Sequence, residues 1–321
     1  MKNGQRRKIS LLSLLILLFC LTCLTGCEEN ENRLEDYSAH YEDSKSVYMG
    51  EINQGMAQDL AVITQADSDL SANVKAALTI NDDTDEVLLS YHAFDKMYPA
   101  SITKVMTALL TLEEADFEEE VMLDHDITFS EGNVVRSTLK KGDTVTVEGL
   151  FNALLVSSDN DCAVILAEHI AGSVADFTDR MNLRAKELGA THTHFANANG
   201  LHDENHYTTA YDLYLIFREA MKYDRFIATI SQKDYTLEYE NAQGYGMEEY
   251  KTSTNAYFNN TYAIPTGINI VGGKTGTTSV AKSCLILYTK NKQDETTISV
   301  VLGAETKNVL YNTMSDLITI E

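Results

Sequence analysis

The chain has 321 residues, of which 44% are hydrophobic, and its formal net charge is −23. This apolar content is sufficient for a full core and excludes a globally disordered chain. The negative charge argues against a nucleic-acid partner and against direct attraction to anionic lipid headgroups, because like charges repel. An anionic substrate would therefore need a local cation.

Residues 1–26 are predicted to be a lipoprotein signal peptide. Basic residues within positions 2–8 precede an almost wholly apolar run at 9–24, and Cys27 follows Gly26. A small residue in this place is typical of an export cleavage site, and the segment resembles the bacterial lipobox. We expect Cys27 to carry lipid and to hold the protein, outside the cytoplasm, at the bacterial cell membrane. An uncleaved anchor helix and cleavage elsewhere are the alternatives.

Residues 27–58 are predicted to form a flexible acidic and polar tether. They are rich in Glu, Asn, Asp and Ser and show little apolar periodicity. A flexible chain of about 30 residues has an r.m.s. span of roughly 30 Å, which would hold the following domain off the membrane. Residues 59–321 are then expected to form the main folded domain.

The predicted elements of this domain follow in chain order. Two strands at 76–80 and 86–91 flank a turn-rich stretch. A long helix follows Pro99, with apolar residues at i, i+3, i+4, i+7 and i+8 from Ile102. Further helices are predicted at 147–156, 162–171, 174–188 and 211–223, strands at 268–272, 283–289 and 297–302, and a closing helix at 308–318.

This order predicts an α/β fold with one sheet built from both ends of the domain. The sheet would be antiparallel and flanked by helices, and a mostly helical lobe would be inserted at about 115–250. Cys162 and Cys284 lie in apolar segments, so buried free thiols are expected rather than a disulfide.

Three short motifs carry the candidate chemistry: Ser101-Ile102-Thr103-Lys104, Ser158-Asp159-Asn160 and Lys274-Thr275-Gly276. In this order they form the pattern of penicillin-binding proteins and class A β-lactamases, in which serine acylation needs no histidine. Lys-Thr-Gly occurs only once, whereas each of the other two patterns occurs three times. Context must therefore decide among the copies.

Only Ser101 begins a strongly amphipathic helix, whereas Ser137 and Ser279 lie in turns. A spacing of three places Ser101 and Lys104 on one helix face, and the free N–H groups of a helix start can stabilise an oxyanion. An ordinary capping serine is the alternative for Ser101.

Of the three Ser-x-Asn copies, only the one at Ser158 lies between two apolar helices; Ser71 and Ser253 lie in polar stretches. Polar groups in that position are costly unless they find partners. Glycines at 272 and 273 flank Lys274 and would allow a ligand backbone to approach closely. For the Ser158 motif the alternative is an ordinary turn between helices. For the Lys274 motif it is a glycine-rich turn.

A metal site was the competing interpretation of four histidines at 192, 194, 202 and 206. Zinc needs three or four convergent ligands. The segment has loop-like composition and contains no His-Glu-x-x-His, so we expect neither a metal ion nor a cofactor.

The chain resembles the serine-type D-alanyl-D-alanine carboxypeptidases, the low-molecular-mass penicillin-binding proteins, from about Val74 to Leu302. The resemblance implies the penicillin-binding transpeptidase-like fold. It rests on residues 98–107, 133–135, 154–161, 171–173, 199–203 and 206–213. The last two stretches favour carboxypeptidases over β-lactamases. The implied partners are peptidoglycan stem peptides, with β-lactams as covalent inhibitors.

The resemblance also implies a role for each motif residue. Ser101 would attack the carbonyl of the penultimate D-alanine, and Lys104 would accept its proton. For this the pKa of Lys104 must be lowered, by burial and by Lys274. Ser158 would relay a proton to the leaving amine, and Asn160 would hydrogen-bond Lys104 and the substrate amide.

On the third motif, Lys274 and Thr275 would bind the terminal carboxylate beside Gly276. Backbone N–H groups of Ser101 and Thr277 would form the oxyanion hole.

Two departures from the family pattern stand out. Asp159 occupies a position that is often glycine, and a charge there could alter the edge of the pocket. The sequence after Gly276 suffices only to finish the sheet and add one helix. We therefore expect a form that lacks the C-terminal domain and is anchored by its N-terminal lipid.

Three other functions are alternatives. A D,D-endopeptidase acting on cross-links would use the same machinery. A β-lactamase is disfavoured because Glu168, Glu187 and Glu204 are not followed by Asn four residues later, unlike the catalytic loop of class A enzymes. A non-catalytic penicillin-binding lipoprotein is disfavoured because all the catalytic side chains are present.

Overall fold

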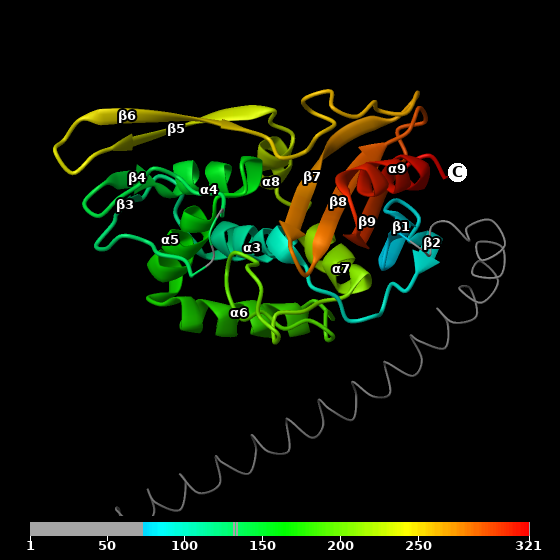
Figure 1. Ribbon diagram of the computed structural model, residues 1–321, viewed down its shortest axis with the longest axis horizontal. Coiled ribbons are helices and arrows are strands. Elements are labelled where there is room, and N and C mark those ends of the chain that lie inside the picture. Colours follow the sequence, from blue (N-terminus) through cyan, green and yellow to red (C-terminus); the bar gives the residue numbers. More distant parts are fainter. Residues whose placement is uncertain (1–72, 131, 133, 321) are drawn as a thin grey trace, which may run out of the picture. The chain divides into compact units, whose positions relative to one another are not determined.

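The computed structural model describes residues 73–130, 132 and 134–320 (Figure 1). The predicted signal peptide, Cys27 and the tether lie outside these residues. A five-stranded sheet has the order β2-β1-β9-β8-β7, and all neighbouring strands are antiparallel. Its strands are β1 (Ala76–Asn81), β2 (Glu86–Tyr91), β7 (Asn269–Thr278), β8 (Lys282–Lys290) and β9 (Thr296–Ala304). The predicted sheet from the two ends of the domain is confirmed.

Hydrophobic cores cover both faces of this sheet. Leu78 and Val300 belong to the core shared with the helical lobe, whereas their neighbours Ala77 and Val301 belong to the core beneath α9 (Lys307–Leu317). This alternation follows because successive side chains of a strand point to opposite faces. Figure 1 shows α9 lying across β8 and β9.

The helical lobe packs around a completely buried helix face. Ile102, Met106 and Leu109 have no more than a trace of exposed surface, as the predicted periodicity requires. The helices are α3 (Lys104–Glu114), α4 (Val147–Val156), α5 (Asn160–Ala171), α6 (Val174–Glu187), α7 (Ala210–Ala220) and α8 (Asp224–Ile230). Within the part of the chain that the structure describes, no helix is long and apolar enough to cross a membrane.

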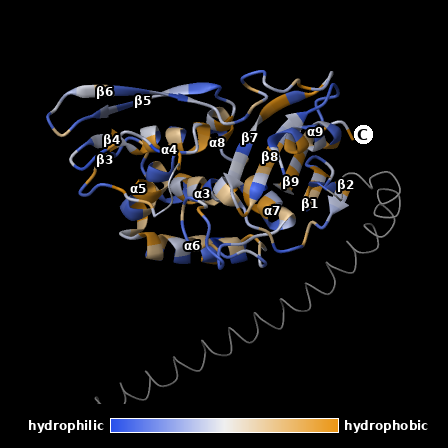
Figure 2. Ribbon diagram, in the orientation of Figure 1, coloured by the Kyte–Doolittle hydropathy of each residue, from blue (hydrophilic) through white to orange (hydrophobic). Residues whose placement is uncertain are grey.

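The lobe also contains a four-stranded sheet that the sequence prediction missed. Its order is β3-β4-β5-β6, with β3 (Glu120–Met122), β4 (Thr144–Thr146), β5 (Asp234–Glu240) and β6 (Gly246–Thr252). In the β5–β6 hairpin only Leu237 and Lys251 are buried, and Figure 2 shows the hairpin as largely hydrophilic. Such strands lack the apolar alternation from which strands are predicted.

The two cysteines of the domain are buried and free, as expected. Burial raises the pKa of Cys284 to about 12 and raises that of Cys162 well above its ordinary value. Because the thiolate is the reactive form, both thiols act as small core residues.

Candidate active site

The backbone around Ser101 is a strained turn. Ser101 lies in a short 3₁₀ helix, η1 (Ala100–Thr103), that runs directly into α3. Ala100 has a φ of 48°, which is rare for a residue with a Cβ. The Thr103 hydroxyl donates to the Ala100 carbonyl over 2.8 Å and so fixes the turn. Strain of this kind persists only where the surroundings hold it in place.

Lys104 is completely buried behind Ser101. Its Nζ lies 3.1 Å from Ser101 Oγ, 3.0 Å from Asn160 Oδ1 and 2.6 Å from the Asn199 carbonyl oxygen. A neutral amine can keep two N–H donors on Asn160 and Asn199 and turn its lone pair towards the Ser101 hydroxyl. This geometry suits a general base for the serine.

Burial lowers the pKa of Lys104 to about 7, while the Asp159 carboxylate acts in the opposite direction. The Lys104 amine is therefore neutral in a large fraction of molecules near neutral pH. Nothing in the sequence indicated a role for Asn199, whose carbonyl oxygen helps to enclose this amine.

Lys274 pairs with Ser158, which lines the same cavity as Ser101. Its Nζ donates to Ser158 Oγ over 2.8 Å and to the Thr275 carbonyl over 2.9 Å. Burial, together with the charge of Lys104, lowers the pKa of Lys274 well below its ordinary value. We had expected both burial and Lys274 to lower the pKa of Lys104. Burial is the main cause of the lowered pKa of both amines, and the charge of Lys104 adds to the lowering at Lys274.

A rising pH profile is the first prediction. Because the protonated amine cannot accept the serine proton, acylation of Ser101 should fall about tenfold per pH unit well below the Lys104 pKa of about 7, and level off above it. The measurement is the second-order rate constant for acylation by a fluorescent penicillin, with circular dichroism at each pH as the control for folding. A flat profile from about pH 5.5 to 8.5 would contradict this account of the base.

The residues predicted for the site meet at one cavity of about 190 Å³. Ser101, Ser158, Thr275, Gly276 and Thr277 line it, and Lys104, Asn160 and Lys274 lie buried around Ser101 and Ser158 with the hydrogen bonds given above. The alternative serines at 137 and 279 are not among its described lining residues.

Gly276 brings β7 against the turn that carries Ser101. A Cβ on Gly276 would lie 2.9 Å from both the Ser101 nitrogen and the Pro99 carbonyl oxygen, which is closer than real Cβ contacts. Only glycine therefore allows the strand to run beside the Ser101 N–H. This is the region where the resemblance places an oxyanion hole.

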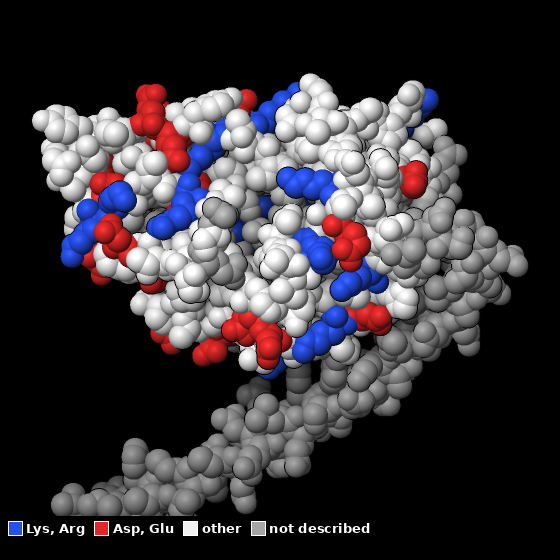
Figure 3. Space-filling view, viewed as in Figure 1, with Lys and Arg blue, Asp and Glu red and all other residues white. Residues whose placement is uncertain are grey.

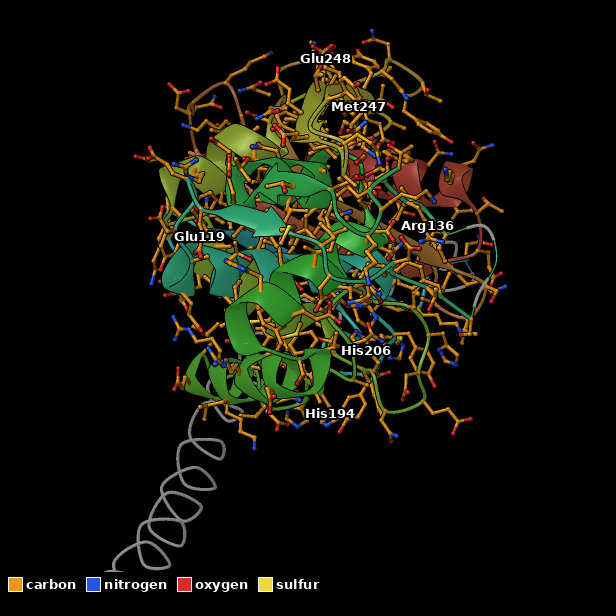
Figure 4. All side chains as sticks on the ribbon, turned by 90° about the vertical axis from the view of Figure 1, so that its left-hand side faces the viewer. Glu119, Arg136, His194, His206, Met247 and Glu248 are labelled. Carbon is orange, nitrogen blue, oxygen red and sulfur yellow. The ribbon has the colours of Figure 1, made fainter. Side chains whose placement is uncertain are left out.

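Asn160 also holds the loop that faces it. Its Nδ2 and its backbone N–H both donate to the Val135 carbonyl, over 2.9 and 3.1 Å. Arg136, labelled in Figure 4, forms an ion pair with buried Asp161 over 3.0 Å. Val135 lines the cavity, so the start of α5 sets one of its walls.

We had expected the charge of Asp159 to alter the edge of the pocket, but Asp159 is not among the described lining residues of the cavity. It is completely buried, and its Oδ2 lies 2.8 Å from Lys251 Nζ. Lys251 in turn lies 2.7 Å from Glu249 Oε1, and Ser157 Oγ donates to Asp159 over 3.0 Å. Lys251, on β6, is the cation that the sequence analysis missed.

Burial raises the pKa of Asp159, although Lys251 opposes the shift. Burial alone would lower the pKa of Lys251, but Asp159 and Glu249 outweigh it and raise it. This buried ionic cluster connects the backbone of the Ser158 motif to the β5–β6 hairpin.

His206 has a structural partner, Thr103, in the turn that carries Ser101. Its Nδ1 accepts from the Ala196 N–H over 3.0 Å, which leaves Nε2–H to donate to Thr103 Oγ1 over 2.7 Å. Burial lowers the pKa of His206 to about 4, so it stays neutral. His194, also labelled in Figure 4, contacts the Asn205 carbonyl. Among the described residues, no group of three ligand-type side chains could hold a metal ion.

Gly200 provides a second prediction. Its φ is 84°, and an added Cβ would lie 1.9 Å from the Ala100 carbonyl oxygen. Gly200→Ala should therefore displace the turn that carries Ser101 and reduce penicillin acylation by at least about tenfold, because small misplacements of reacting groups are costly.

The matched control is Gly172→Ala, with a φ of 81° and no atom within 4 Å of the new Cβ. It should lose about 1 kcal/mol of stability through backbone strain and keep its acylation rate. Equal acylation rates for the two variants would show that the contact with Ala100 is unimportant.

The fold and the meeting of Ser101, Lys104, Ser158 and Lys274 define the class of penicillin-binding, transpeptidase-like serine peptidases. The sequence profile of one family, peptidase S11, described as D-alanyl-D-alanine carboxypeptidase, matches residues 61–306. The chain belongs to this family.

A relative of known type supports this family assignment. D-alanyl-D-alanine carboxypeptidase DacF of Bacillus subtilis is 34% identical over 244 residues, which cover 74% of this chain and 59% of that protein. The chain thus matches about three fifths of the length of that relative.

Two solved structures share the fold. The crystal structure of the Streptomyces K15 DD-transpeptidase has a TM-score of 0.70 and 26% identity, covering 77% of this chain and 96% of that one. Penicillin-binding protein D2 of Listeria monocytogenes, bound to cefotaxime, has a TM-score of 0.64 and 28% identity with the same coverage.

Proposed function

We propose that the protein is a serine-type D-Ala-D-Ala carboxypeptidase that removes the terminal D-alanine from peptidoglycan stem peptides and is acylated by β-lactams. The observation that carries the proposal is the contact of 3.1 Å between Ser101 Oγ and Lys104 Nζ, an amine whose pKa burial lowers to about 7. The family and its cefotaxime-binding relative support the choice of substrate and inhibitor.

The reaction follows from the positions of four side chains. Ser101 Oγ attacks the carbonyl carbon of the penultimate D-alanine as its proton passes to Lys104. Ser158, held by Lys274 over 2.8 Å, delivers a proton to the nitrogen of the departing D-alanine, and the C–N bond breaks. The proton that Lys104 took from Ser101 restores the Ser158 hydroxyl. Water then attacks the acyl-enzyme ester, releases the shortened peptide and restores the Ser101 hydroxyl.

Release of free D-alanine from a stem pentapeptide tests the proposal. The protein without its predicted signal peptide and tether should produce equimolar tetrapeptide and D-alanine. Intact-mass analysis should detect one penicillin per chain. Cleavage of a cross-linked dimer without D-alanine release would favour an endopeptidase. Rapid penicillin hydrolysis without D-alanine release would favour a β-lactamase, and stable acylation without any peptide turnover would favour a non-catalytic binder.

The same proposal includes a membrane anchor at Cys27, and the sequence pattern at residues 9–27 supports it. Cys27→Ser should abolish lipidation, so that the protein accumulates unprocessed or enters the medium. Detergent partitioning and metabolic labelling with a fatty-acid analogue measure this. If the variant is processed and partitions into detergent like the parent, Cys27 is not the anchor.

A further inference from the structure

Two buried polar side chains, Thr103 and His206, lie next to the nucleophile turn and take no part in the reaction described above. Thr103 is 1% exposed and His206 2%. Figure 3 shows acidic and basic side chains on the visible face of the molecule, where water can replace a lost hydrogen bond. Water cannot replace a bond between Thr103 and His206 in this way, so its loss should be felt by the groups that it holds.

The hydrogen bonds of His206 fix which ring nitrogen carries the proton. Nδ1 lies 3.0 Å from the Ala196 nitrogen and must accept, because a backbone N–H can only donate. Burial lowers the pKa of His206 to about 4, so the ring is neutral and its single proton is on Nε2. Nε2 lies 2.7 Å from Thr103 Oγ1 and therefore donates to it.

The Thr103 hydroxyl extends this bond to the turn that carries Ser101. Because its oxygen accepts from His206, its proton is available for the Ala100 carbonyl oxygen, to which it donates over 2.8 Å. The two bonds form a directed chain from the His206 ring through one hydroxyl to one carbonyl. Successive hydrogen bonds of this kind polarise and strengthen each other.

This chain of hydrogen bonds ends on the peptide group that contains the Ser101 N–H. The Ala100 carbonyl and the Ser101 N–H belong to one planar unit, so a bond that holds the carbonyl also sets the direction of the N–H. Ser101 lines the cavity, and Gly276 allows β7 to pass close to the Ser101 nitrogen. The φ of 48° at Ala100 is unfavourable for a residue with a Cβ, and the backbone therefore needs support at this point.

The segment that carries His206 is itself held in place. Tyr207 and His194 exchange backbone hydrogen bonds of 2.8 and 2.9 Å. Thr208 pairs in the same way with Met97, over 2.7 and 2.9 Å, just before the nucleophile turn. The imidazole of His206 can therefore fix the turn rather than follow its movements.

We propose that His206 and Thr103 are positioning residues that orient the Ala100–Ser101 peptide group, so that its N–H points at the oxygen of the tetrahedral intermediate. This inference deepens the proposed function and rests on it for the identity of the natural substrate. Negative charge on that oxygen develops only as the transition state forms. The two residues should therefore affect the acylation step and leave the initial binding of the ligand unchanged.

Saturation kinetics of penicillin acylation separate these two steps, because they give a dissociation constant for the first complex and a rate constant for acylation. Thr103→Val nearly keeps the shape of the side chain but leaves the Ala100 carbonyl without its donor. It should lower the acylation rate constant about ten- to a hundredfold and leave the dissociation constant within about twofold of the parent. Thr103→Ser keeps the hydroxyl, so its rate constant should stay within about threefold.

Thr107→Val is the matched control. The Thr107 side chain is also completely buried, and its hydroxyl donates to the Ala198 carbonyl over 2.6 Å, rather than to the peptide group of Ser101. The two valine variants should lose similar stability in urea unfolding, whereas only Thr103→Val should be acylated slowly. Equal acylation rate constants for the two variants, or a change in the dissociation constant alone, would overturn the proposal.

Two substitutions of His206 test the direction of the chain, and they decide the proposal even if Thr103→Val does not fold. A glutamine amide nitrogen can take the place of Nε2 and donate to Thr103. An asparagine oxygen can take the place of Nδ1 and accept from Ala196, but it leaves Thr103 without a donor. His206→Gln should therefore be acylated at least about tenfold faster than His206→Asn. Equal rate constants would show that the donor to Thr103 has no effect on the oxyanion.

These measurements separate the inference from the proposed function, because penicillin acylation needs only a reactive Ser101. If the parent protein releases no D-alanine from a stem pentapeptide, the proposed function fails. The roles of Thr103 and His206 are still decided by the acylation rate constants.

Discussion

Ser101→Ala should lose essentially all acylation, with D-alanine release at least about 10⁴-fold below that of the parent, as for removal of the nucleophile in other serine peptidases. The reason is geometric. Ser101 Oγ is the hydroxyl that lies 3.1 Å from the Lys104 amine. Without it no acyl-enzyme can form, and direct attack by water on the substrate is far slower. Intact-mass analysis after incubation with penicillin should show no adduct.

Serines from the two other Ser-x-x-Lys copies provide the controls. Ser137→Ala and Ser279→Ala change the same atoms outside the described cavity lining and should keep full acylation. A penicillin adduct on Ser101→Ala would refute Ser101 as the nucleophile. Loss of the adduct in one of the control variants would point to that serine instead.

The sequence predicted the meeting of the motifs well because each motif depends on local structure. Ser101 and Lys104 share a helix turn, Ser158 follows one apolar helix and precedes another, and glycines permit the close approach of β7. The charge states depend instead on burial by distant segments. Lys104 and Lys274 look alike in sequence, and only the complete fold shows that both are enclosed and compete for charge.

The residues whose roles could not be predicted share one property: no pattern in the neighbouring sequence marks them. Lys251 lies in a polar hairpin strand, where nothing in the sequence distinguishes a lysine in solvent from one buried against Asp159. Lys307 begins a helix, a common place for a surface lysine, and only the fold shows that the start of this helix lines the cavity. His206 belongs to a stretch of the family resemblance but gains its role from Thr103, far away in the chain.

Lys251→Met should destabilise the protein by about 3–5 kcal/mol, because it leaves the carboxylate of Asp159 buried without a counterion. Asp159 is 0% exposed and Lys251 5% exposed, so water cannot replace the missing charge. The same change should slow acylation of Ser101, since Asp159 adjoins Ser158, whose backbone φ of 67° needs support. Urea unfolding and penicillin acylation rates measure the two effects.

Lys222→Met is the matched control, since Lys222 forms an exposed ion pair with Glu219. Exposed pairs contribute little, so its stability should stay within about 1 kcal/mol of the parent. A comparable loss in both lysine variants would mean that burial of the Asp159–Lys251 pair has no special effect.

The double variant Asp159→Asn/Lys251→Met distinguishes an unpaired charge from lost packing. If the buried carboxylate causes the defect, its removal should recover most of the stability, because a buried ion pair can often be replaced at little cost whereas half of one cannot. Recovery of acylation together with stability would show that the pair supports the Ser158 motif mechanically. Recovery of stability without acylation would instead show that the charge of Asp159 acts on the buried Lys104 amine, whose pKa it raises. The structure favours the mechanical outcome, because Asp159 contacts Lys251 directly, whereas Lys104 is held by Asn160 and Asn199.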